Sequence, residues 1–175
     1  MTFSLFSAPG VEFLLRWTHF LAGVMWIGLL YYFNFVQGAF MAEAAAAAKP
    51  EVTTKLLPRA LWWFRWAAMV TFLAGWIIII KKIGEGSPAF GYNPYWVSIL
   101  IGGVLGSIMW FNVWFIIWPN QKFIIETTKT AIAAGRAVEG LGNRPRVAML
   151  TSRLNTALSI PMLFFMAAAS HMPWH

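Results

Sequence analysis

Two histidines are the side chains in this sequence best suited to chemistry, and both lie in apolar stretches. His19 lies in the first third of the run Arg16–Val36, and His171 closes the last apolar run. A neutral imidazole is a good axial ligand for haem iron, so histidines on facing helices could hold a b-type haem. Two alternatives stand beside haem. His19 could hydrogen-bond a neighbouring helix while His171 lies in water, or the histidines could serve a proton or quinone.

The residues around His19 favour close approach by another group. Ala22 and Gly23 follow one helical turn later, so the same face offers an imidazole above a gap for a flat group or another helix. His19 should lie roughly 12 Å below the start of its helix, whereas His171 lies close to a helix exit. These depths match poorly for a shared cofactor.

A second candidate is a polar patch near the opposite end of the helices. Arg153 and Asn155 begin the last apolar stretch, and Arg65 and Asn112 are expected at similar depth. A buried cluster of this kind could bind an anion or a planar polar substrate. The alternative is interfacial snorkelling combined with hydrogen bonds between helices, and Asn112 in particular is expected to bond to another helix.

Several classes of chemistry lack support. The chain has no cysteine, which excludes thiolate metal sites, iron–sulfur clusters and a covalently attached CxxCH haem. No metal-ligand cluster, paired carboxylates, nucleophile triad or phosphate loop is present, so we expect no metal site. The net charge of +7 is explained by basic connections between apolar runs, and we expect no nucleic-acid binding.

The elements that must position these residues are membrane helices. The sequence is 59% hydrophobic and 11% charged, and about 20 apolar residues suffice for one crossing. We therefore predict a single all-α integral membrane domain over residues 1–175, a bundle of four transmembrane helices in contact with the lipid bilayer. The predicted spans are about 11–42, 61–80, 95–118 and 147–172.

The connections between spans are also predicted. The alanines Ala44–Ala48 should extend the first helix until Pro50 stops it, and Lys49–Arg59 should form a polar connection. Residues 121–140 read as a separate amphipathic helix on the cytoplasmic surface, because Lys122, Lys129 and Arg136 are seven residues apart.

The third span has a face with almost no side chains. Gly102 and Gly106 lie four residues apart, with Ser98 one turn earlier. Such a stripe packs backbone-close against another helix, and other membrane subunits or a second copy of the chain are the partners we expect.

Basic residues predict the orientation. One side of the bilayer receives Lys49, Lys55, Arg59, Arg65, Lys122, Lys129, Arg136, Arg144, Arg146 and Arg153. Only Arg16, Lys81 and Lys82 fall on the other. The positive-inside rule then places both termini on the side of the membrane that faces away from the cytoplasm.

Four strings carry a resemblance to a known family. They are RWTHFLAGVMWIGLLYYF from Arg16, WFRW from Trp63, FNVWFIIWPNQK from Phe111, and the stretch Asn155–His171 with LSIPMLFFM. In this order they resemble the N-terminal membrane domain of the membrane-bound, cytochrome-c-linked urate oxidase (urate hydroxylase) family, in a shortened form without the cytochrome c domain. The resemblance implies a helical membrane domain working with periplasmic electron transfer, and carries over His19 within R-W-x-H.

Two functions from different classes follow. In one, the chain is an accessory subunit of a membrane electron-transfer assembly. In the other, it is a redox protein that binds haem b, oxidises urate or another small reductant and passes electrons to a separate periplasmic cytochrome c. A transporter or channel has less support, because the spans carry few interior charges to line a pathway.

Overall fold

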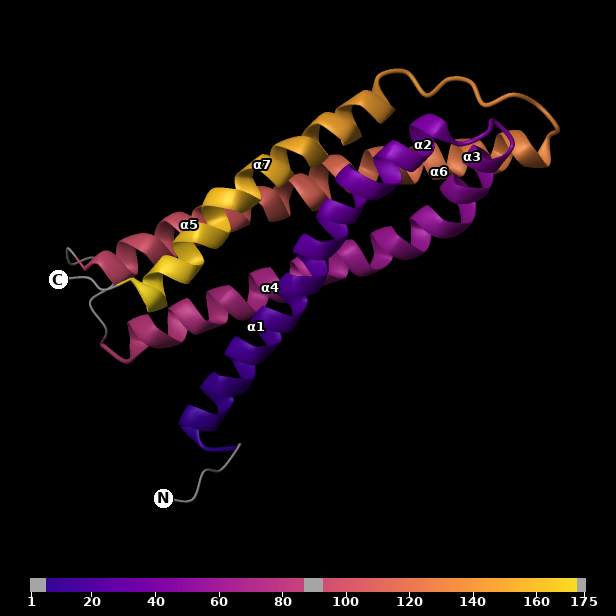
Figure 1. Ribbon diagram of the computed structural model, residues 1–175. Coiled ribbons are helices and arrows are strands. Elements are labelled where there is room, and N and C mark those ends of the chain that lie inside the picture. The colour runs from indigo at the N-terminus through magenta and orange to yellow at the C-terminus, as the bar shows by residue number, and fades with distance from the viewer. Residues whose placement is uncertain (1–5, 87–92, 173–175) are drawn as a thin grey trace.

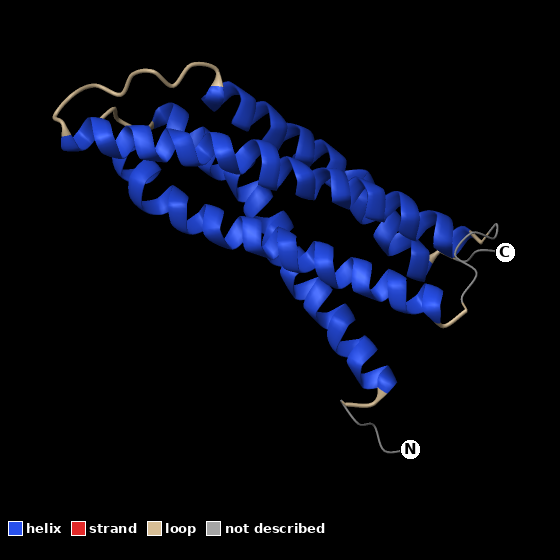
Figure 2. Ribbon diagram, turned by 180° about the vertical axis from the view of Figure 1, so that it is seen from behind, coloured by secondary structure: helices blue, strands red, loops and turns tan. Residues whose placement is uncertain are grey.

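The computed structural model describes residues 6–86 and 93–172, and they fold into helices joined by short turns and one longer loop (Figure 2). The helices are α1 (Ala8–Tyr31), α2 (Gly38–Glu43), α3 (Ala48–Glu51), α4 (Leu57–Gly84), α5 (Pro94–Phe111), α6 (Trp118–Ala133) and α7 (Arg144–His171). Three π-helical segments, η1 (Tyr32–Gln37), η2 (Val52–Leu56) and η3 (Asn112–Ile117), join neighbouring α-helices without a break.

Joined in this way, the helices form four long rods: Ala8–Glu43, Ala48–Gly84, Pro94–Ala133 and Arg144–His171. Each is long and apolar enough to cross a membrane. The first rod packs mainly on the second through α1 and α4, and the third packs mainly on the fourth through α5 and α7 (Figure 1). The fold class predicted from the sequence is therefore confirmed in its all-helical, four-rod form.

The connection after the first rod differs from the prediction. The rod ends at Glu43, and Ala44 is already extended, so the alanines make the turn rather than lengthening the helix. Pro50 lies in the first turn of the second rod, where a missing N–H costs no hydrogen bond, so it helps to start a helix that it was expected to end. The expected polar connection Lys49–Arg59 is consequently helical.

The separate amphipathic helix predicted over residues 121–140 is also corrected. α6 continues directly from α5 and η3 and ends at Ala133. Pro119 does not break it, because the π-helical turn of η3 just before the proline can re-satisfy the freed backbone groups. The amphipathic pattern itself is present: Ile125 and Thr128 are buried, whereas Lys122 and Lys129 are exposed.

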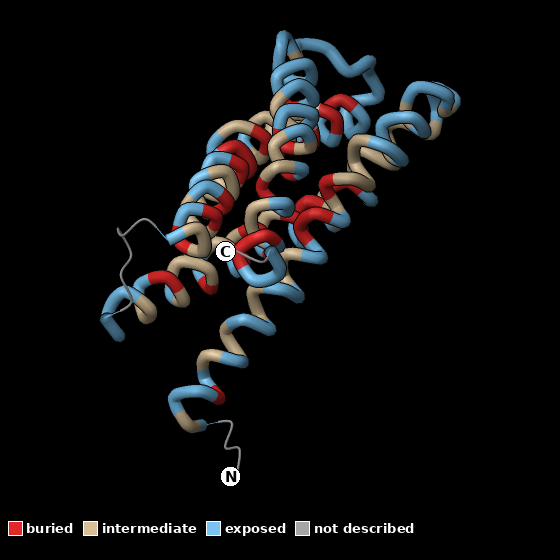
Figure 3. The backbone as a smooth tube through the Cα atoms, turned by 60° about the vertical axis from the view of Figure 1, so that its left-hand side comes forward, coloured by how far each residue is buried: buried red, intermediate tan, exposed pale blue. Residues whose placement is uncertain are grey.

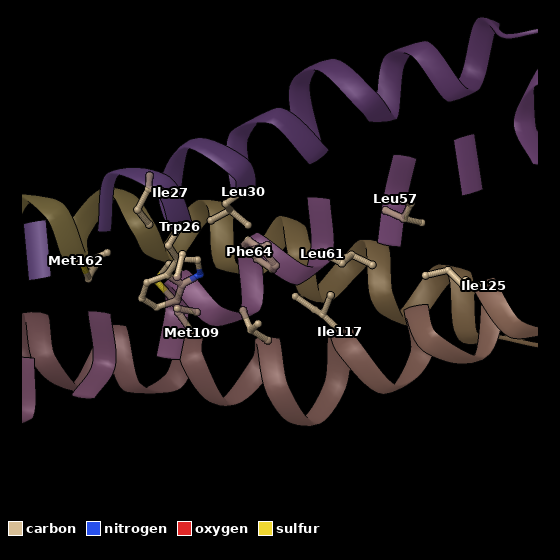
Figure 4. Close-up of a cluster of buried hydrophobic side chains, with 13 residues drawn as sticks. Trp26, Ile27, Leu30, Leu57, Leu61, Phe64, Met109, Ile117, Ile125 and Met162 are labelled. Carbon is tan, nitrogen blue, oxygen red and sulfur yellow. The ribbon is translucent and has the colours of Figure 1, made fainter. Parts of the chain in front are cut away.

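The core lies where the two helix pairs meet. Trp26 and Leu30 of α1 contact a cluster that includes Phe64 of α4 and Met109 of α5, all nearly inaccessible to solvent (Figure 4). Figure 3 shows buried segments concentrated in this middle region, while the first half of α1 is mostly exposed or half-buried. The outward sides of the helices carry large apolar residues such as Phe115 and Ile160, as expected for surfaces that face lipid.

Two of the π-helical segments present amides to α7. Asn34 in η1 donates to Ser152 Oγ over 2.8 Å, and Asn112 in η3 donates to Asn155 Oδ1 over 2.8 Å. The amide of Asn155 in turn donates to the carbonyl of Met109 over 3.0 Å. The predicted bond from Asn112 to another helix is thus confirmed, and it ties η3 to α7.

We expect removal of this amide pair to weaken the junction between α5 and α7. Replacing Asn112 by leucine leaves Asn155 Oδ1 buried without a donor, so the free energy of unfolding should fall by about 1–2 kcal/mol. The double variant Asn112→Leu/Asn155→Leu should lose less than the sum of the single variants. Denaturant titration in mixed micelles measures the free energies of unfolding of the single and double variants. Thr130→Ala is the control, because Thr130 is exposed and its hydroxyl bonds only within its own helix. Strict additivity of the two single variants would contradict the pairing.

Candidate functional site

One cavity of about 390 Å³ opens between all four rods, at the end where α4 finishes and α5 begins. Its walls are almost entirely apolar. α1 contributes His19, Phe20, Gly23, Val24, Trp26 and Ile27; α4 contributes Thr71, Phe72, Gly75, Trp76 and Ile79; α5 contributes Gly103, Gly106 and Ser107; α7 contributes Met162, Leu163, Met166, Ala167 and His171. Its size lies in the range of roughly 300–1,000 Å³ that is typical of small-molecule and cofactor sites.

His19 is held in one orientation by α4. Its Nδ1 lies 2.8 Å from the carbonyl oxygen of Thr71, which can only accept, so Nδ1 carries the proton. The hydroxyl of Thr71 is itself engaged with the carbonyl of Ala67. In a neutral ring this leaves Nε2 as the unprotonated nitrogen, which is the state in which histidine ligates a metal.

Glycines make room for the imidazole. A Cβ atom on Gly75 would lie 2.9 Å from Cε1 of His19 and 3.1 Å from Nδ1, so the ring rests directly against the backbone of α4. A Cβ on Gly23 would lie 3.8 Å from the side chain of Thr71, an ordinary contact. Gly75 of α4 therefore accommodates a specific side chain of α1 in addition to allowing the two helices to approach closely.

The structure brings the two candidate histidines to one cavity. His171 is exposed at the end of α7 and lines the same space as half-buried His19. The predicted mismatch in depth does not separate them, because α1 crosses α4 at an angle and its first turns extend away from α7 (Figure 1).

Charged residues cluster at this end of the α1–α4 pair. Glu12 binds Arg16 of its own helix over 2.8 Å, and Lys81 and Lys82 of α4 over 3.1 Å and 3.3 Å. Lys81 also pairs with Glu85. The pairs of Glu12 with Lys81 and Lys82 join α1 to α4 a few turns from His19. The cluster as a whole carries a net positive charge.

The predicted polar patch forms only in part. Asn112 and Asn155 are buried together, as described above. Arg153, two residues from Asn155, falls on another side of α7 and is exposed. Arg65 lies against tryptophan rings rather than against the amides, with its guanidinium carbon 3.9 Å from the ring centre of Trp118.

A second cavity, of about 240 Å³, lies toward the Glu43 end and was not anticipated from the sequence. Its walls include Asn34, Gln37, Gln121 and Ser152, and Oε1 of Gln37 is buried without a hydrogen-bond partner. The sequence signal was present, since Asn34 and Gln37 are the amides of a charge-free run, but their spacing alone did not indicate a shared space.

Within residues 6–86 and 93–172, no three His, Cys, Asp or Glu side chains gather as a metal-ion site would require. The cavity thus offers single imidazole ligands in an apolar space. That arrangement suits a group that brings its own remaining ligands, such as a macrocycle, better than a bare ion.

Residues 6–86 and 93–172 form an all-helical fold with four helices long and apolar enough to span a membrane, which points to a lipid environment. Residues 92–175 match the model of a family described as urate oxidase N-terminal, so this half of the chain carries a urate oxidase N-terminal-like domain. The match confirms the resemblance drawn from the FNVWFIIWPNQK and Asn155–His171 strings, while the strings around His19 and Trp63 lie outside the matched residues. No curated protein and no solved structure matches the chain.

Proposed function

We propose that the chain is a membrane subunit of an electron-transfer system, and that the four-helix cavity would hold a b-type haem, with the imidazole of His19 as a ligand to its iron. The observation that carries the proposal is the hydrogen bond that orients the His19 ring and from which its tautomer follows. Its Nδ1 is bonded to Thr71 over 2.8 Å in an apolar cavity that His171 shares. A backbone carbonyl on the second ring nitrogen is the usual support of a ligating histidine.

The residues of the cavity fit a haem. Gly75 makes room for the His19 ring, Gly106 keeps the α5 wall free of a side chain, and Phe72 and Trp76 offer aromatic surface to a flat apolar group. His171 supplies a second imidazole. The positive cluster around Arg16 and Lys81 lies at the same end of the bundle and suits the carboxylates of a haem. A haem bound there supplies one-electron chemistry.

The chain's own residues have defined roles in this proposal. Thr71 orients the imidazole and keeps Nε2 free of a proton, while Trp26 and Met162 close the cavity toward the core and exclude water. Exclusion of water and a low local dielectric tune the potential of a bound redox group.

The proposal includes the setting expected from the family resemblance and the charge pattern. The chain acts in the bacterial inner membrane with both termini periplasmic, beside other membrane subunits or a second copy of itself. Electrons leave through a separate periplasmic cytochrome c. Urate or another small reductant is the donor. The urate oxidase N-terminal-like domain over residues 92–175 supports this setting.

An absorption spectrum tests the proposal. Protein purified in detergent from haem-replete cells should show a Soret band and reducible α and β bands. His19→Ala should remove the Soret band, because the axial ligand is gone, and added imidazole should restore part of it. The neighbouring variant Thr18→Ala, which changes α1 outside the cavity lining, should keep the spectrum of the parent protein.

His171→Ala separates the two modes of ligation. If both histidines bind the iron, this variant converts a six-coordinate low-spin spectrum into a five-coordinate high-spin one. If His19 is the only protein ligand, the spectrum does not change. A folded, colourless parent protein would exclude the haem proposal.

A further inference from the structure

Arg65 is surrounded by aromatic rings at the end of the bundle away from the histidine cavity. Its guanidinium carbon lies 3.9 Å from the ring centre of Trp118, 5.7 Å from that of Trp114 and 6.0 Å from that of Trp66. Trp66 and Trp114 meet edge to face, with ring centres 5.4 Å apart. These rings fix the position of the charge without neutralising it.

Hydrogen-bond donors in this group are left over. Nε of Arg65 and Nε1 of Trp114 are both buried without a partner. Arg65 forms no ion pair with any acid in the described part of the chain, unlike Lys81 or Lys55, which both pair with glutamates. No acceptor in the described part of the chain bonds the Arg65 guanidinium, so its terminal nitrogens remain for an acceptor from outside the chain, and an oxyanion that accepts two hydrogen bonds matches their geometry best.

The depth of Arg65 identifies the class of acceptor. From Lys81 back to Arg65, α4 rises about 24 Å, a little less than the hydrocarbon thickness of roughly 30 Å. With Lys81 and Lys82 at one boundary, Arg65 lies a few ångströms inside the other. Exposed Trp62 and Trp63 on the same stretch of α4 mark that boundary as an aromatic belt. Lipid phosphates are the oxyanions just outside this boundary, within reach of an arginine side chain that extends toward it.

We propose that Arg65, Trp66, Trp114 and Trp118 form a binding site for the phosphate of an anionic membrane lipid in the leaflet on the Glu43 side. Arg65 reaches the headgroup with its terminal nitrogens, and Trp118 holds the guanidinium flat. This assignment rests on the proposed membrane crossing of α4 and α5 but not on haem. The site secures α4 to the continuous third rod, because its rings come from α4, η3 and α6.

Native mass spectrometry of the full chain tests the site. Protein is released from detergent micelles containing equal amounts of dioleoylphosphatidylglycerol and dioleoylphosphatidylcholine, and the lipids retained on the protein are counted. The parent protein should retain phosphatidylglycerol preferentially. Arg65→Gln should weaken this retention by at least about tenfold, as expected when charge-assisted hydrogen bonds are lost.

Arg59→Gln is the matched control, because Arg59 is an exposed arginine on the same helix whose guanidinium lies over no aromatic ring in the described structure. It should retain the lipid as the parent does. Equal losses in Arg65→Gln and Arg59→Gln, or no preference for phosphatidylglycerol in the parent, would overturn the site. Release of the lipid by inorganic phosphate would overturn its assignment to a lipid. Purification of the chain without detergent would instead refute the membrane crossing.

Discussion

Replacement of Gly75 by alanine is expected to leave the protein folded and to reduce its haem content by about ten- to a hundredfold. The added Cβ would lie 2.9 Å from Cε1 of His19, closer than packed atoms approach, so the imidazole must move away from α4. Movement breaks the 2.8 Å bond to the carbonyl of Thr71. The haem-to-protein ratio, from the pyridine haemochrome and the protein concentration, measures the effect.

Gly103→Ala is the control for this experiment. Gly103 lines the same cavity, but its added Cβ would meet only Cδ1 of Ile79, at an ordinary 3.8 Å. It should therefore bind haem as the parent does. Nitrogen-15 spectra of labelled histidine provide a reading that does not depend on haem. Apo-protein should show an Nδ1-protonated His19, and Gly75→Ala should lose that signature. An unchanged His19 tautomer in Gly75→Ala would refute the proposed steric mechanism.

The sequence was sufficient to predict four helices because the chain keeps charge out of long apolar runs, and such runs have few alternatives to helix. It was less informative about where helices end. Pro50 was expected to end a helix, and the third span was expected to end at residue 118, just before Pro119. Pro50 instead lies in a first turn, and Pro119 lies in a helix that continues from the π-helical segment η3. The spacing of apolar residues does not indicate a π-helical turn. The continuity of the third rod could therefore not be predicted from the sequence.

The sequence was sufficient to predict which residues belong to the candidate site, but not how they are arranged in space. A lone imidazole in a charge-free run made His19 conspicuous, whereas its contact with Gly75 depends on the crossing of α1 over α4, which a sequence does not specify. The poor match in depth followed from treating the helices as parallel to one another. Arg153 was misplaced for a simpler reason: residues two apart on a helix do not share a face, so it could not join Asn155.

The Gly102 stripe was expected to receive another subunit, and the structure assigns that face to the chain's own α7. A Cβ on Gly102 would lie 3.1–3.3 Å from three atoms of the Met166 side chain, and Gly102 is buried. Packing at this distance leaves no space for a partner helix on the same face. A partner subunit, as proposed above, would have to bind another surface, such as the outward side of α1.

Gly102→Leu should consequently destabilise the isolated chain rather than only its assembly. Four added carbons have to displace Met166, and overpacking of this kind costs typically about 1–3 kcal/mol. Denaturant titration in mixed micelles should show this loss, with weaker protection of α5 and α7 in hydrogen exchange. Gly28→Leu is the matched control, because nothing lies within 4 Å of a Cβ at Gly28 and the residue is exposed. That variant should be at least as stable as the parent, since leucine is the better helix former. The opposite result would be equal stability of Gly102→Leu and Gly28→Leu, with loss of copurifying subunits only in Gly102→Leu. It would show that the Gly102 stripe binds another subunit and not α7.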